Sequence, residues 1–183
     1  MAAGLLTLAV GNFWMSRLNL DISPWQVVWP RVVVIAGLSM LFAPLNVAAF
    51  LHIPRELRGA AVGLLALLRN EGGSVGTSVA QTILERREQF HTLRLNENLD
   101  VLNPAVYQLL TQGRSFFLQL TGDASLSKQL TSRAMELARN QQALSLAYFD
   151  VFWFSAAVAA TMISLVLLMR RSVAEKGAHV APE

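Results

Sequence analysis

Three adjacent polar side chains, Arg69, Asn70 and Glu71, lie in the middle of an otherwise uncharged stretch, residues 59–84. A charge at the centre of a membrane costs about 2.5–3.5 kcal/mol on insertion scales and normally faces a protein interior or a water-filled cavity. These groups could therefore meet a substrate, a proton or a neighbouring helix as the protein changes state. The alternative is that Arg69 and Glu71 form structural ion pairs with neighbouring helices, and the residues alone leave both interpretations open.

Three further polar side chains lie at or inside apolar stretches. Asn46 follows Pro44 by two residues, so it could bond a carbonyl that the proline frees, or line a pore. Asp150 directly precedes the last apolar run, where a helix N-terminus favours a carboxylate; a proton-carrying role is the alternative. Arg31 could extend its charged group to the membrane edge. Pro44 itself predicts a kink in its helix.

Enzyme chemistry and metal binding have little support in the sequence. The chain has no cysteine, and none of its three histidines has a partner at helix-ligand spacing. No glycine loop followed by lysine and no set of nucleophile, base and orienting group occurs. We therefore expect no enzyme activity, no metal site and no cofactor. The net charge is +3, but no basic stripe interleaved with aromatic residues occurs, so we expect no nucleic-acid partner.

The elements that must position these groups are membrane helices. Hydrophobic residues make up 54% of the 183-residue chain, and charged residues make up 15% and are clustered. A helix crosses the hydrocarbon layer of about 30 Å with roughly 20 apolar residues. The sequence predicts an all-α integral membrane protein with these segments: a truncated transmembrane helix 1–16, a short extracytoplasmic turn 17–30, a transmembrane helix 31–51, a cytoplasmic link 52–58, a small-residue transmembrane helix 59–84, an extracytoplasmic loop with amphipathic helices 85–146, a transmembrane helix 147–170 and a cytoplasmic tail 171–183.

The orientation of these segments follows from the basic residues of the short connections. Positive charge concentrates on the cytoplasmic side of short loops. The 52–58 link and the C-terminal tail together carry Arg55, Arg58, Arg170, Arg171 and Lys176. We therefore expect both of them, and so the C-terminus, to be cytoplasmic.

Small residues recur at a spacing of four along the 59–84 segment. Such a stripe lets two helix backbones approach closely, which is a main route to helix association in a membrane. The sequence predicts a packing face made of Gly59, Gly63, Gly72, Gly76 and Ala80.

The 85–146 loop carries helix signals of its own. Asn103 and Pro104 form a cap and a first helical position, and Gly122 is a stop signal. Asp123 could then cap a second amphipathic helix. We expect two amphipathic helices outside the membrane, lying either on its surface or against the protein.

Taken together, these features resemble the C-terminal region of the fourteen-helix drug:proton antiporters of the major facilitator superfamily, EmrB/QacA type. A proline-containing span, a short "IP" link and an R-N-x-G-G-S-x-G span match at Pro44, Ile53, Pro54, Arg69, Asn70, Gly72, Gly73, Ser74 and Gly76. An R-x-x-x-H pattern and a QA-x-x-x-A-Y-x-D-x-F pattern match at Arg87, His91, Gln142, Ala143, Ala147, Tyr148, Asp150 and Phe152.

This resemblance implies a partial major facilitator bundle of about four transmembrane helices in the bacterial inner membrane. It implies that the parent protein exports small amphipathic compounds, such as drugs, by proton antiport through alternating access. The partners would be the lipid bilayer, the missing N-terminal transporter helices, the substrate and protons, with a periplasmic adaptor as a further candidate. On this interpretation, the 183 residues alone should not transport.

A different class of protein also fits the sequence. The chain could be a small helical membrane subunit or scaffold whose 85–146 loop binds a partner, without transport activity. An upstream reading frame that encodes further spans would favour the transporter.

Overall fold

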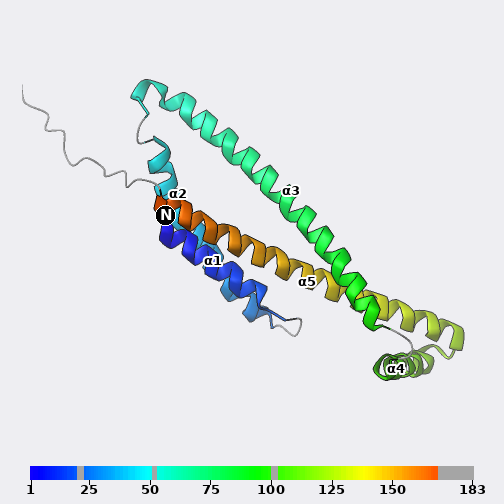
Figure 1. Cartoon of the computed structure of the whole chain (residues 1–183). Helices are drawn as coiled ribbons and strands as arrows, with labels where there is room; N and C mark the ends of the chain where they lie inside the picture. The colour runs from blue at the N-terminus through cyan, green and yellow to red at the C-terminus, as the bar shows by residue number, and fades with distance from the viewer. Residues whose placement is uncertain (20–22, 51–52, 100–102, 169–183) are drawn as a thin grey trace, which may run out of the picture.

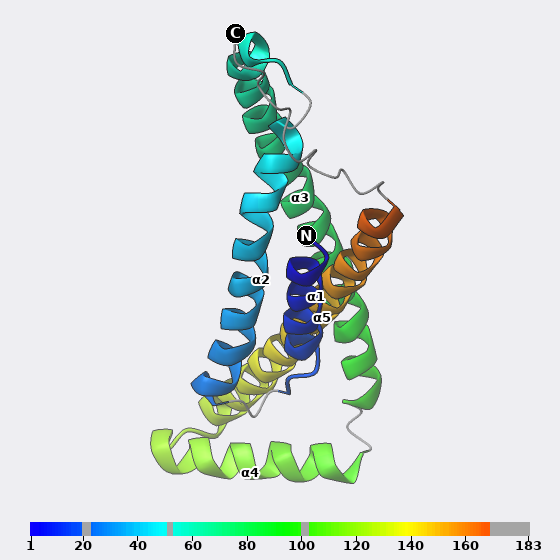
Figure 2. The ribbon, with the colours of Figure 1, turned by 90° about the vertical axis from the view of Figure 1, so that its left-hand side faces the viewer.

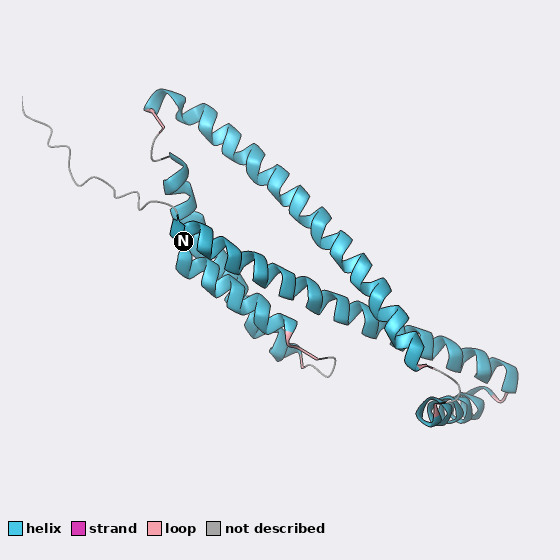
Figure 3. Cartoon of the chain, viewed as in Figure 1, coloured by secondary structure: helices cyan, strands magenta, loops and turns pink. Residues whose placement is uncertain are grey.

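The computed structural model describes residues 1–19, 23–50, 53–99 and 103–168. Within these ranges the chain is helical and contains no strand (Figure 3). The helices are α1 (Ala2–Ser16), α2 (Pro24–Phe50), α3 (Arg58–Asn98), α4 (Pro104–Thr121) and α5 (Ala124–Leu168), with a short 3-10 turn, η1 (Arg55–Leu57), before α3. The predicted tail 171–183 lies outside the described residues.

Helix α5 holds the molecule together, because it packs against α1, α3 and α4 (Figure 1). Helix α1 lies between α5 and α2 and packs along both. Helices α2 and α3 touch each other only slightly. Helix α4 lies across the end of the molecule where α3 ends and α5 begins (Figure 2).

Helices α3 and α5 are longer than the membrane segments that the sequence predicts within them. They contain 41 and 45 residues, which corresponds to about 62 and 68 Å at 1.5 Å per residue. Each is about twice the thickness of the hydrocarbon layer. The helices continue because no glycine or proline occurs in 77–103 or in 123–168, so a change from apolar to polar residues does not end them.

Three glycines allow α1 and α2 to pack closely. A Cβ atom on Gly37 of α2 would lie 2.6 Å from the backbone nitrogen of Leu8 and 2.9 Å from the carbonyl oxygen of Gly4. A Cβ on Gly11 would lie 2.7 Å from a methyl group of Val34. Gly4 and Gly11 are seven residues apart, so they share one face of α1. This contact is therefore a backbone-to-backbone contact, of the kind small residues permit.

The glycines predicted to form a packing face have no neighbour in this structure. A Cβ on Gly59, Gly63, Gly72 or Gly76 would meet nothing within 4 Å. Ala80 is only half-buried. This face of α3 is thus uncovered by the described residues, and its packing role stays a prediction.

Helix α2 contains two prolines. The helix runs without interruption through Pro30 and Pro44. Pro30 is fully buried, and its carbonyl oxygen lies next to Gly11 of α1. The kink expected at Pro44 stays a prediction.

Two described helices, α2 and α5, are long and apolar enough to cross a membrane. Only 6% of the most apolar stretch of α2 and 11% of that of α5 is buried, which is unlike the core helix of a soluble protein. Helix α3 is not one of the two, because Arg69, Asn70 and Glu71 lower its mean hydropathy. Helix α1 is apolar but shorter.

The ends of α4 confirm the cap signals in the sequence. The Asn103 side chain accepts a hydrogen bond from the Ala105 amide, Pro104 begins the helix, and Gly122 ends it with a φ of 67°. The Asp123 carboxylate accepts hydrogen bonds from the amides of Ser125 and Leu126 at the start of α5.

Replacing Gly122 with alanine should loosen the turn between α4 and α5. A left-handed backbone costs an L-residue about 1–2 kcal/mol, so we expect hydrogen exchange of the α4 amides to accelerate about five- to thirtyfold. Gly59→Ala is the matched control, since nothing lies within 4 Å of its added Cβ. Equal exchange rates in the two variants would contradict the role given to Gly122.

Candidate functional site

A polar cluster joins α3 to α5. The Nε atom of Arg87 donates to Oδ2 of Asp150 at 2.7 Å, and Nε2 of His91 lies 2.6 Å from the same oxygen. Arg87 and His91 belong to α3, and Asp150 belongs to α5. One carboxylate oxygen therefore links two residues of a different helix.

The helices place these groups by simple geometry. Arg87 and His91 are four residues apart, so they lie on one face of α3. Leu84 of α3 is 9% exposed and Ala147 of α5 is fully buried, and each precedes a member of the cluster by three residues and so shares its helix face. A small side chain at the helix contact lets the backbones approach, which brings Asp150 within hydrogen-bond reach of α3.

The cluster can hold a proton in more than one place. An ionised carboxylate only accepts hydrogen bonds, so His91 then carries its hydrogen on Nε2; a protonated Asp150 could donate to His91 instead. The hydrogen bond to Asp150 raises the pKa of Arg87 above its ordinary value, so Arg87 stays charged. The side chains of Arg87, His91 and Asp150 are 44%, 17% and 31% exposed, so water can reach them.

An aromatic ring borders the cluster on α3. The Phe90 ring packs edge-on against the His91 ring, with centroids 5.5 Å apart. The guanidinium carbons of Arg87 and Arg94 lie 5.1 and 5.6 Å from the centroid of Phe90. These cation–π contacts limit the positions open to Arg87.

The other candidate residues lie apart from this cluster. The Arg69 guanidinium carbon lies 5.0 Å from the centre of the Phe42 ring of α2. Asn70, Glu71 and Arg31 are exposed and Asn46 is half-buried. Within the described residues, the side chains of these four form no hydrogen bond or ion pair. Arg69 precedes Arg87 by 18 residues on one helix, a distance of about 27 Å.

The sequence predicts a candidate functional role for Asp150 but not its contacts with Arg87 and His91. The family resemblance includes Arg87 and His91, but it does not predict that they contact Asp150. The available signal was an arginine and a histidine four residues apart near one apolar segment, with a lone carboxylate beside another. In the described ranges, no group of three or more histidine, aspartate or glutamate side chains could hold a metal ion.

Comparison with curated proteins identifies relatives of the chain. Multidrug export protein EmrB of Escherichia coli K12 is 27% identical over 139 residues, which is 75% of this chain and 25% of that protein. EmrB of Haemophilus influenzae is 30% identical over 132 residues, or 72% and 24% of the two chains. The chain is a homologue of EmrB-type multidrug transporters. Fatty acid resistance protein FarB of Neisseria gonorrhoeae is 31% identical over 108 residues, or 59% of this chain and 21% of FarB.

The EmrB-type relatives confirm the resemblance that the sequence motifs indicated. The chain spans about a quarter of the length of these relatives. No protein-family model and no solved structure matches it. The relatives are membrane transporters rather than enzymes, so the chain lies in a membrane. This location accounts for the large apolar side chains exposed along α2 and α5.

Proposed function

We propose that the chain is part of a secondary transporter that exports small amphipathic compounds, including drugs, in exchange for protons. The observation that carries this proposal is its similarity, over most of its length, to proteins named for multidrug export. Exchange would occur by alternating access in a major facilitator bundle, in which two halves rock around a central site.

In this proposal, residues 1–16, 31–51, 59–84 and 147–170 lie in the bacterial inner membrane. The 85–146 segment is extracytoplasmic, and the C-terminus is cytoplasmic. The lengths of α3 and α5 support this arrangement, because each helix exceeds the hydrocarbon layer by about 30 Å. Helix α4, which lies across their far end, is then about 20 Å or more beyond the lipid, which favours contact with protein over the membrane surface.

The uncovered face of α3 would pack against transporter helices that this chain does not include. Its glycines have open space around them, and apolar side chains such as Leu64, Leu67 and Leu68 are exposed. Buried among further helices, Arg69, Asn70 and Glu71 would line a cavity or form ion pairs. Either arrangement would lower the cost of their charges in the membrane.

The Arg87–His91–Asp150 cluster would couple protons to the movement of α3 against α5. Protonation of Asp150 removes the anion that Arg87 contacts at 2.7 Å. The attraction between the two helices would weaken at that point, because an ion-dipole contact replaces an ion pair. A proton arriving from the extracytoplasmic side could thus loosen one end of the seam.

Helix α4 supports the proposal of an adaptor partner. Its Tyr107, Phe116 and Leu120 are each more than half exposed, and such surfaces mark interaction sites. A periplasmic adaptor protein could cover them. The same surface suits the alternative function, a membrane subunit or scaffold that binds a partner without transport.

Dye accumulation in bacteria tests the proposed export. Cells that express the transporter polypeptide containing these residues should accumulate less of a fluorescent amphipathic dye than control cells. An uncoupler that collapses the proton gradient should abolish the difference. Glu71→Gln should reduce export, whereas Glu97→Gln, at an exposed pair with Arg94, should not. Unchanged accumulation in cells that contain the protein in their membranes would favour the scaffold.

A further inference from the structure

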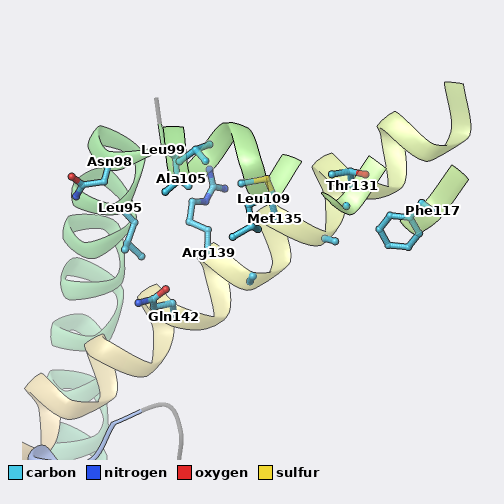
Figure 4. A pocket seen from close by; sticks show the side chains of 14 residues that line it. Leu95, Asn98, Leu99, Ala105, Leu109, Phe117, Thr131, Met135, Arg139 and Gln142 are labelled. Carbon is cyan, nitrogen blue, oxygen red and sulfur yellow. The ribbon is translucent and has the colours of Figure 1, made fainter. Parts of the chain in front are cut away.

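A groove lies between the end of α3, α4 and the first part of α5 (Figure 4). Its volume is about 390 Å³, within the range of about 300–1,000 Å³ that small-molecule sites occupy. Apolar side chains from all three helices form the walls, among them Leu95, Val106, Phe117 and Met135. The groove is about 15–20 Å along α3 from the predicted membrane edge at Leu84.

The groove is built before any ligand arrives. A Cβ atom on Gly113 of α4 would lie 2.8 Å from a methyl group of Thr131 on α5, so the two helices are in close contact there. Oγ of Ser127 donates to the carbonyl oxygen of Arg114 at 2.6 Å, and Ser127 and Thr131 are each 2% exposed. Because these contacts already hold α4 against α5, ligand binding loses less free energy to ordering the two helices.

One positive charge lies among the apolar walls. Arg139 extends from α5 toward the end of the groove lined by Leu99 and Ala105 (Figure 4). Its guanidinium donates to Oδ1 of Asn96 at 2.8 Å and to Oδ1 of Asn140 at 3.0 and 3.2 Å. Both acceptors are neutral amides, and none of the groove-lining residues that the structure describes, which exclude 100–102, is acidic. Among the described residues, no acidic group therefore neutralises Arg139, whose positive charge an anion can pair with.

We propose that this groove binds an amphipathic anion, with an alkyl chain along the apolar walls and a carboxylate on Arg139. The groove has the volume of a small-molecule site and carries one charge. Stable protein interfaces are larger and bury about 800 Å² on each side. These features favour a small molecule over a partner helix. Binding at this site does not depend on whether the chain takes part in transport. A long-chain carboxylate has the required chemistry at both ends.

The test uses the full 183-residue chain in lipid nanodiscs and dodecanoate with a photoreactive diazirine at its methyl end. Crosslinks located by mass spectrometry should fall on α4 and the first part of α5. Unlabelled dodecanoate should compete about tenfold better than decanoate, since each buried CH₂ tightens binding about three- to fourfold. Dodecylamine should compete at least tenfold less well than dodecanoate.

Arg139→Gln should weaken the crosslinking about tenfold, and Arg139→Lys should restore part of it. Arg133→Gln is the matched control on α5, because Arg133 does not line the groove. Equal competition by the carboxylate and the amine would overturn the proposal, as would crosslinks spread along α2 or an equal loss in the Arg133 variant. If the transporter polypeptide fails to export dye but dodecanoate still binds the groove, only the transporter proposal is contradicted.

Discussion

Replacing Asp150 with asparagine should partly separate α3 from α5 at the Arg87–His91–Asp150 cluster. The substitution removes the anion at 2.7 Å from Arg87 and at 2.6 Å from His91. Hydrogen bonds to charged groups contribute about 1.5–3 kcal/mol when well buried, and these groups are partly exposed, so we expect a loss of about 1–2 kcal/mol. In the transporter polypeptide, the same change should lower proton-coupled dye export about tenfold or more.

Spin labels can measure this separation, because the chain has no native cysteine. Labels at Leu93→Cys on α3 and Tyr148→Cys on α5 occupy exposed positions. The distance distribution should broaden and shift to longer values in the Asp150→Asn background. Glu97→Gln, which removes an exposed ion pair with Arg94, should leave the distribution unchanged. An unaltered distribution with Asp150→Asn would mean that the cluster does not hold the helices together.

Replacing Gly37 with alanine should push α1 away from α2. The new methyl group would lie 2.6 Å from the Leu8 nitrogen and 2.9 Å from the Gly4 oxygen. Both are backbone atoms, so a side-chain rotation cannot relieve the overlap. Overpacking of this kind costs about 1–3 kcal/mol, and a chain of this size should then unfold about 3–10 °C lower in mild detergent.

Gly72→Ala provides the control for this prediction. Nothing lies within 4 Å of its added Cβ, and alanine stabilises a helix interior by about 0.5–1 kcal/mol relative to glycine. The 183-residue chain should therefore tolerate or gain from this change. In a longer transporter polypeptide the same change should impair export, because further helices would cover that face. A similar drop in unfolding temperature for both variants would refute the α1–α2 contact.

Local signals in the sequence predicted local structure well. The cap at Asn103, the stop at Gly122 and the cap at Asp123 depend on residues within a few positions of one another, and the structure has each of them. The all-helical fold follows in the same way from the lengths of the apolar runs. The family resemblance likewise depends on motifs of neighbouring residues, and the EmrB-type relatives confirm it.

Contacts between distant segments were harder to predict. The link between Arg87 and Asp150 spans 63 positions, and no periodicity within one helix reveals which faces of two helices meet. The same holds for Gly4, Gly11 and Gly37, whose close contacts join two different helices. Hydropathy predicts where a segment leaves the lipid but not where its helix ends. The full lengths of α3 and α5 therefore could not be predicted from it.

Transport by purified protein in liposomes tests the central proposal most directly. The transporter polypeptide that contains these residues would be reconstituted with a fluorescent amphipathic dye, and a pH gradient would then be imposed. We predict dye movement against its gradient with protons moving the opposite way, and its loss in Asp150→Asn but not in Glu97→Gln. Dye movement that ignores the pH gradient, or no movement by a correctly inserted protein, would contradict proton-coupled export.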